Sequence, residues 1–158
     1  MSYNPHDNFK LVGKNLYIGD FLTSINYNLL VNYNITHILV CAKELCCRYP
    51  ETFTYKHLTI TDLPETEIRD YFDEAHDFIS KGTRNGRVLV HCAEAKSRSV
   101  SIVLSYFMKV NQLDYRKAHK IIKKYHPTAE PNKGFKKQLI LYEREVCPRN
   151  SNCINSIF

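Results

Sequence analysis

The fold is decided by one stretch of the chain, Val88-Leu89-Val90-His91-Cys92-Ala93-Glu94-Ala95-Lys96-Ser97-Arg98-Ser99. Apolar β-forming residues lead into a cysteine, an arginine follows after five further residues, and residues 100–110 have amphipathic spacing. This order predicts a strand, a tight loop and a helix. A loop that leads into a helix directs several backbone N–H groups to one point, where the helix dipole also favours negative charge. We therefore expect this loop to bind a phosphate group.

The two ends of the loop carry residues that suit phosphate chemistry. Cys92 lies at its start, where the positive field of a helix N-terminus favours the thiolate, the nucleophilic form of cysteine. Arg98 lies at its end and supplies a planar, two-pronged donor for phosphate oxygens. Attack of the thiolate on phosphorus would give a phosphocysteine that water then hydrolyses. The alternative is a buried structural cysteine with a solvated arginine nearby.

His91-Cys92 and Ser97-Arg98-Ser99 resemble the His-Cys-x-x-Gly-x-x-Arg-Ser signature of the cysteine-dependent protein phosphatases, and of their dual-specificity branch in particular. Further stretches match this family in order, namely Leu16-Tyr17-Ile18-Gly19, Ile35-Thr36-His37-Ile38-Leu39, Ile60-Thr61-Asp62, and Pro131-Asn132-Lys133-Gly134-Phe135 with Gln138-Leu139. The resemblance covers residues 12–146. It implies a protein-tyrosine-phosphatase-like catalytic domain over 13–147, an N-terminal lead-in over 1–12 and a C-terminal tail over 148–158.

The apolar periodicity of the whole chain indicates one α/β domain. Strands are expected at 15–18, 37–41, 55–60 and 87–90, and helices at 25–33, 67–81, 100–110, 115–125 and 132–146. Strands that alternate with helices predict a central, mostly parallel sheet of about 4–5 strands flanked by helices. We expect the lead-in to be poorly ordered.

The family resemblance implies a function for each loop residue. It implies hydrolysis of phosphotyrosine and phosphoserine or phosphothreonine in phosphorylated proteins, with no cofactor and no metal. Ser99 would donate to the Cys92 sulfur and ease its departure from phosphorus, although an ordinary first-turn serine is the alternative. His91 would brace the loop and help keep Cys92 ionised, with a satisfied structural histidine as the alternative. The expected phosphate-binding loop comprises His91, Ala93, Glu94, Ala95, Lys96, Ser97 and Arg98.

A carboxylate is needed to protonate the leaving oxygen and then to activate water. Asp62 is the candidate because it follows the end of a predicted strand, and ligands bind at that edge of a parallel sheet. It also matches the general-acid position of the family. The alternative is an aspartate that serves only a turn or a helix cap.

Three residues depart from the family pattern or point to other substrates. Ala95 stands where the family has glycine, so a weakly active or non-catalytic phosphoprotein-binding module is one alternative. A positive φ at this position would cost Ala of order 1 kcal/mol. Lys96 resembles the phosphoinositide-cleaving relatives, which makes a lipid phosphatase a second alternative. His126 occupies a position where arginine is common.

The cysteines favour reduced thiols. There are six of them, at positions 41, 46, 47, 92, 147 and 153, and they lack the paired spacing of a zinc site. With no export signal at Met1, we expect a cytoplasmic protein, with the nucleus as the alternative compartment. Some relatives carry a cysteine at the Cys41 position that forms a reversible disulfide with the nucleophile, so Cys41 is a candidate redox partner. A buried, apolar-like cysteine is the alternative.

Charge gives a weaker indication of partners. The 158 residues carry a formal charge of +6, and they contain no apolar run long enough to predict a transmembrane segment. No nucleic-acid partner is expected. A solvated helix face is one interpretation of the basic residues in the predicted helix 115–125, and a surface for an acidic partner or an anionic membrane is the other. These residues are Arg116, Lys117, Lys120, Lys123 and Lys124.

Overall fold

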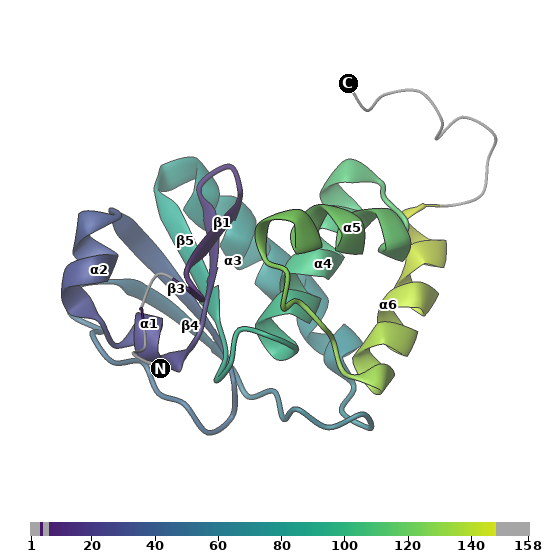
Figure 1. Ribbon diagram of the computed structural model, residues 1–158, viewed down its shortest axis with the longest axis horizontal. Coiled ribbons are helices and arrows are strands. Elements are labelled where there is room, and N and C mark those ends of the chain that lie inside the picture. The colour runs from purple at the N-terminus through teal and green to yellow at the C-terminus, as the bar shows by residue number, and fades with distance from the viewer. Residues whose placement is uncertain (1–3, 5–6, 148–158) are drawn as a thin grey trace.

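A single mixed sheet forms the centre of the molecule (Figure 1). The computed structural model describes residue 4 and residues 7–147. The sheet has the strand order β1-β2-β5-β3-β4. Strands β1 and β2 are antiparallel, and every other neighbouring pair is parallel. The bounds are β1 Lys10–Gly13, β2 Leu16–Gly19, β3 Ile35–Cys41, β4 Thr54–Leu58 and β5 Arg87–His91. This architecture confirms the predicted α/β fold with a mostly parallel sheet.

Helices cover both faces of the sheet. The two short helices α1 and α2 pack on one face, and α3 and α4 pack on the other, where α5 and α6 form an outer layer against α4 (Figure 1). The bounds are α1 Phe21–Ser24, α2 Tyr27–Asn32, α3 Phe72–Asn85, α4 Arg98–Asn111, α5 Tyr115–Tyr125 and α6 Lys133–Val146, and a 3₁₀ turn, η1 Ile68–Tyr71, precedes α3. None of the helices in the described part of the chain is long and apolar enough to cross a membrane.

Strand β5 is buried on both of its faces. Val88 and Val90 point into the larger core beneath α3 and α4, and Leu89 points into the smaller core beneath α1 and α2. A strand covered on both faces needs an uninterrupted apolar run, which is why Val88-Leu89-Val90 shows no polar alternation. The strand therefore holds the residue that follows it, Cys92, at the centre of one sheet edge.

The N-terminal lead-in is more ordered than predicted. Strand β1 begins inside it, and both Phe9 and Val12 are buried. The expectation of poor order is therefore wrong for residues 9–12, because their apolar side chains complete the core. The sequence does not reveal this strand, since it is too short to show an alternating pattern of apolar residues. The helix predicted at 25–33 is present as the shorter α2, which Asn26 caps, and an additional short helix, α1, capped by Asp20, precedes it. The predicted C-terminal tail lies outside the described residues.

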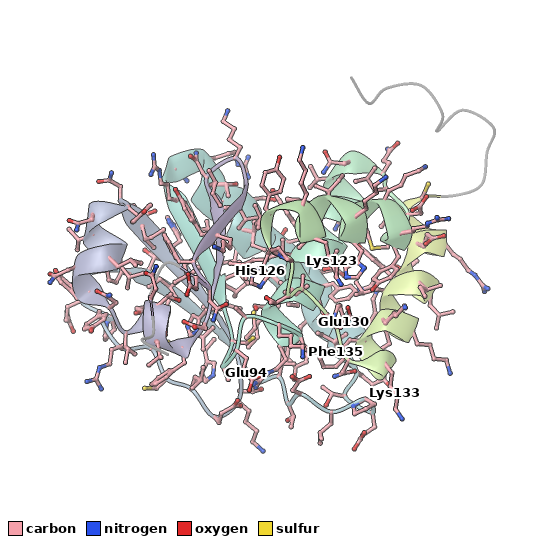
Figure 2. The ribbon with its side chains drawn as sticks, in the orientation of Figure 1. Glu94, Lys123, His126, Glu130, Lys133 and Phe135 are labelled. Atoms are coloured by element: carbon pink, nitrogen blue, oxygen red, sulfur yellow. The ribbon has the colours of Figure 1, made fainter. Side chains whose placement is uncertain are left out.

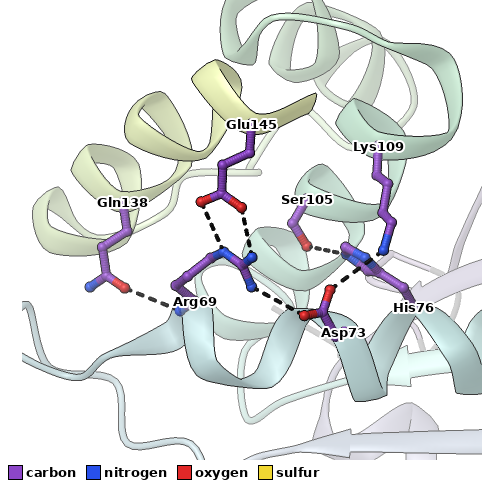
Figure 3. A network of polar contacts seen from close by, with 7 residues as sticks. All are labelled: Arg69, Asp73, His76, Ser105, Lys109, Gln138 and Glu145. Atoms are coloured by element: carbon purple, nitrogen blue, oxygen red, sulfur yellow. Dashed lines mark hydrogen bonds and ion pairs between the residues drawn. The ribbon is translucent and has the colours of Figure 1, made fainter. Parts of the chain in front are cut away.

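Helix α6 is joined to the segment that precedes α3 (Figure 3). Arg69 forms an ion pair with Glu145 at 2.7 Å, and its backbone N–H donates to the Gln138 side chain. Gln138 in turn donates to the Thr66 carbonyl oxygen at 2.8 Å. At the start of α6, a side chain at Gly134 would collide with the backbone of Pro64. The first turns of α6 therefore lie directly against the residues that follow β4.

Candidate active site

The predicted site residues meet at one edge of the sheet. Cys92 follows β5 and Asp62 follows β4, two parallel strands that flank β3, so both residues lie at the carboxyl-end edge of the sheet, where ligands bind in such folds. A pocket of about 180 Å³ opens there. Its lining consists of Asp62, Cys92, Ala93, Glu94, Lys96, Ser97 and Arg98. Within the described residues, no cluster of three or more His, Cys, Asp or Glu side chains could hold a metal ion.

The thiol lies at the bottom of this pocket, before the start of α4. Cys92 is almost completely buried, with 2% of its surface exposed. The hydroxyl of Ser99, in the first turn of α4, lies 3.2 Å from the Cys92 sulfur. When the sulfur is a thiolate, it can only accept, so the Ser99 hydroxyl donates. The Ser99 hydroxyl is therefore within hydrogen-bond reach of the sulfur.

The guanidinium of Arg98 is held by a residue that the sequence analysis missed. Glu44, in the loop after β3, accepts from Nη1 at 2.7 Å and from Nη2 at 2.6 Å. Nη1 also donates to the Ile60 carbonyl oxygen at 3.2 Å. The hydrogen bond from Arg98 holds the pKa of Glu44 below its usual value, so the pair is charged at neutral pH. The only signal in the sequence is an acidic residue just past a predicted strand that ends at the same sheet edge.

One oxygen of Asp62 is fixed by two donors. The Ser97 hydroxyl and the Asn132 side-chain amide both donate to Asp62 Oδ1, each at 2.8 Å. The neighbouring 3₁₀ turn begins at Ile68 and has no side-chain cap, so Asp62 does not cap it. The carboxyl group instead contacts Ser97 in the loop of Cys92.

Comparisons with known proteins identify the family of this chain. Residues 16–145 match the family described as "Dual specificity phosphatase, catalytic domain". The chain belongs to this family. It is 42% identical over 137 residues to the dual specificity protein phosphatase 1 of Arabidopsis thaliana, which covers 86% of this chain and 69% of the relative. It is 38% identical over 136 residues to the dual specificity protein phosphatase 1B of the same plant, covering 85% and 81% of the two chains.

Solved structures of dual specificity phosphatases share the fold. The crystal structure of DUSP15 superimposes with a TM-score of 0.81 at 30% identity, over 92% of this chain and 98% of that chain. The structure of a human tyrosine phosphatase-like serine/threonine/tyrosine-interacting protein superimposes with a TM-score of 0.82 at 27% identity, over 88% of this chain and 97% of that chain. The protein is thus a hydrolase of the dual specificity phosphatase class, which acts on phosphotyrosine and phosphoserine or phosphothreonine in proteins, as the sequence predicted.

Ala95, where the dual specificity phosphatase signature has glycine, adopts the backbone conformation that favours glycine. Its φ is 57°, in the left-handed region, and its methyl group is fully buried in the larger core. The residue does not line the pocket. The methyl group therefore points away from the phosphate position, and its effect is a local strain in the loop rather than a narrower pocket.

The connection between α5 and α6 supports the strained part of this loop (Figure 2). The His126 imidazole donates from Nε2 to the Ala95 carbonyl oxygen, and the backbone N–H of Glu130 donates to the Lys96 carbonyl oxygen at 2.9 Å. His126 is buried, and burial lowers its pKa. From the other side, the backbone N–H of Phe21 donates to the Ala93 carbonyl oxygen at 3.0 Å. The loop is therefore held from both sides through its carbonyl groups.

His91 is neutral in the folded protein. Burial lowers its pKa to about 4, although a hydrogen bond to the Cys92 carbonyl oxygen, at 3.4 Å from Nδ1, acts in the opposite direction. Because the carbonyl can only accept, the proton of the ring lies on Nδ1. His91 thus braces the start of the loop through a hydrogen bond, and it brings no positive charge to the thiol.

Cys41 lies beside Cys92. Val40 pairs with His91 in the parallel β3–β5 register, so the next residues along the two strands, Cys41 and Cys92, are neighbours. Burial raises the pKa of the Cys41 thiol well above its usual value, and the neighbouring Cys92 raises it further. Cys41 is therefore a protonated thiol next to the candidate nucleophile.

Proposed function

We propose that this phosphatase hydrolyses phosphoproteins through a phosphocysteine at Cys92. The Cys92 thiolate attacks phosphorus, the bond from phosphorus to the ester oxygen breaks, and Asp62 gives its proton to the departing oxygen. Water then attacks the phosphocysteine, Asp62 takes a proton from it, and the thiolate leaves with phosphate released. The observation that carries this proposal is that Cys92, Arg98 and Asp62 line one small pocket.

The remaining loop residues stabilise charge on the phosphoryl group. Backbone amides of residues 93–98 and the guanidinium of Arg98 bind the equatorial oxygens, where negative charge spreads in the transition state. One edge of the guanidinium is occupied by Glu44, and the buried Nε has no partner among the described residues. The edge that includes Nε is therefore available for phosphate, as a two-pronged donor.

The charges at the pocket favour a phosphoprotein over a phosphoinositide. Lys96 lines the pocket, as expected for a lipid phosphatase, but Glu94 lines it as well. Their opposite charges offset one another, so the lining offers no surplus of positive charge for a polyanionic inositol headgroup.

An acidic segment of the protein substrate would bind the basic side chains of α5. Two of them are already neutralised, because Lys117 pairs with Asp114 and Lys123 pairs with Glu130. Arg116, Lys120 and Lys124 are exposed and form no ion pair with any residue that the structure describes. Replacing these three by serine is expected to lower kcat/KM for an acidic phosphoprotein and to leave p-nitrophenyl phosphate hydrolysis unchanged. Equal effects on both substrates would contradict this role.

The first experiment measures phosphate release from p-nitrophenyl phosphate by reduced protein between pH 5 and 8. We expect turnover by the wild type, none by Cys92→Ser, and wild-type rates from the matched variant Cys147→Ser, which is remote from the pocket. Asp62→Ala is expected to lose most activity on esters with poor leaving groups. Tight phosphopeptide binding without turnover would instead support the non-catalytic module, and faster release from phosphoinositides than from phosphopeptides would support the lipid phosphatase.

A further inference from the structure

Asp62 belongs to a closed set of hydrogen bonds that joins three separate segments of the chain. Ser97 and Asn132 each donate to Asp62 Oδ1 at 2.8 Å. The backbone N–H of Asn132 also donates to the Ser97 hydroxyl at 3.0 Å. The loop after β4, the phosphate-binding loop and the start of α6 therefore meet at this carboxyl group.

The direction of each hydrogen bond in this set is fixed by backbone groups. Asn132 is the N-cap of α6, and its Oδ1 accepts from the backbone N–H groups of Gly134 and Phe135, each at 3.0 Å. Since Oδ1 is occupied as an acceptor, the NH₂ group is the end that faces Asp62. The Ser97 hydroxyl accepts from a backbone N–H, which can only donate, so its own proton points to Asp62.

These directions distinguish the two oxygens of Asp62. Oδ1 receives two protons from its neighbours and can act only as an acceptor, so a proton on this carboxyl group resides on Oδ2. We propose that Asn132 and Ser97 are positioning residues that make Oδ2 the proton-carrying oxygen of the general acid. This proposal rests on the role of Asp62 in the proposed function.

The support for Asn132 is rigid enough for such a role. The first turns of α6 are held to the residues after Asp62 by the hydrogen bond from Gln138 to Thr66 and by the close packing of Gly134 on Pro64. The amide that fixes Asp62 is thereby fastened to the same segment as the carboxyl group. The general acid is consequently preset against the phosphate-binding loop.

The test removes the donor and keeps the helix cap. In Asn132→Ser, the serine hydroxyl can still cap α6, but no side-chain NH₂ faces Asp62. The readout is the ratio of kcat/KM for p-nitrophenyl phosphate, a good leaving group, to that for phenyl phosphate, a poor one. We expect this ratio to rise about tenfold, within the range that general acid catalysis supplies. Asn26→Ser, the same change at the cap of α2, is the matched control and is expected to leave the ratio unchanged.

Ser97→Ala provides a second variant and is expected to raise the ratio in the same direction. In an Asp62→Ala background, Asn132→Ser is expected to cause no further change in the ratio, because the residue acts through the carboxyl group. Equal losses on both esters, or a further rise in the ratio without Asp62, would overturn the proposal, and thermal unfolding of each variant identifies a misfolded one. A wild type that hydrolyses neither ester would refute the proposed function itself, and the positioning role with it.

Discussion

Both outer nitrogens of Arg98 are bound by the carboxylate of Glu44, at 2.7 and 2.6 Å. Arg98 is almost buried, whereas about half of the Glu44 side chain is exposed, at 52%. An arginine has many rotamers, and a pairing through two nitrogens fixes the plane of the guanidinium. Glu44 therefore sets the orientation in which Arg98 meets a phosphate group, although it does not line the pocket.

Replacing Glu44 tests this orientation. Glu44→Gln keeps the size of the side chain and removes the charge that pairs with Arg98. We expect kcat/KM for p-nitrophenyl phosphate to fall by about tenfold, which corresponds to the loss of roughly one charge-assisted hydrogen bond. Competitive inhibition by inorganic phosphate is expected to weaken in parallel, because the free enzyme also presents Arg98 less well.

The matched control is Glu51→Gln, in the same loop. Glu51 is exposed, and its side chain forms no ion pair with any residue in the described part of the chain. It is expected to behave as the wild type in both assays. An unchanged inhibition constant for phosphate in Glu44→Gln would show that Arg98 keeps its orientation without the carboxylate.

The left-handed Ala95 predicts a nearly neutral Ala95→Gly substitution. Glycine relieves a backbone strain of about 1–2 kcal/mol, but it loses a buried methyl group worth about 0.8 kcal/mol and pays about 0.5–1 kcal/mol in chain entropy. These contributions offset one another, so we expect the unfolding temperature to change by less than about 4 °C. Calorimetry checks the temperature. A rise in kcat/KM of about tenfold would show that the methyl group distorts the loop amides and would support the weakly active alternative.

Two buried histidines predict a loss of stability in mild acid. Burial lowers the pKa of His76 from 6.5 to about 4, with Lys109 acting in the same direction and Asp73 against it, and burial likewise lowers that of His91 to about 4. The unfolded chain binds these protons below pH 6.5 and the folded chain does not. The free energy of unfolding therefore has its full value above pH 6.5 and falls as the pH decreases towards 4. The two groups together lower it by up to about 2.7 kcal/mol per pH unit.

His76→Phe separates the two contributions. His76 stacks on the Phe72 ring, and its Nε2 donates to the Ser105 hydroxyl (Figure 3). The Ser105 hydroxyl itself donates to the Ile102 carbonyl oxygen and so keeps a partner in the variant. Urea unfolding at several pH values is expected to show a decline between pH 6.5 and 4 that is less steep than in the wild type, by up to about 1.4 kcal/mol per pH unit. If the stability of the variant declines as steeply as that of the wild type, the proton that destabilises the fold is taken up by a group other than His76.

The register of β3 and β5 predicts a reversible disulfide between Cys41 and Cys92. Neighbouring strands lie about 4.8 Å apart, which falls within the span of about 4.4–6.8 Å that a disulfide requires between its Cα atoms. Peroxide would oxidise Cys92 to the sulfenic acid and be reduced to water, and Cys41 would then displace a second water as the S–S bond forms. Because the pKa of Cys41 is raised, we expect this second step to accelerate with increasing pH.

Mass spectrometry and recovery of activity check this disulfide. After peroxide treatment, thiols are expected to restore the wild type and the control variant Cys46→Ser, whose cysteine is exposed in the following loop. Cys41→Ser is expected to stay inactive, because its Cys92 oxidises further to the sulfinic acid. Sulfinic Cys92 in the wild type, with Cys41 unmodified, would contradict the prediction.

Local patterns were sufficient to predict the strand, loop and helix around Cys92. An apolar run, a cysteine, an arginine and an amphipathic segment specify neighbouring pieces of one chain, so their geometry follows from spacing alone. Asp62 could be predicted for a related reason, since the carboxyl ends of parallel strands converge on one edge. Strand β1 could not, because four residues at a sheet edge carry too little periodicity.

The sequence by itself determined the fold class, the family and the residues that we propose for the chemistry. Only the tertiary structure decided what holds them in place. Glu44 lies 54 positions from Arg98, and Asn132 lies 70 positions from Asp62. Pairs so distant in the chain meet only after the sheet and α6 have packed, and no local propensity encodes which acid faces which arginine. The conformation of Ala95 depends in the same way on the α5–α6 connection, because its carbonyl oxygen is held by His126.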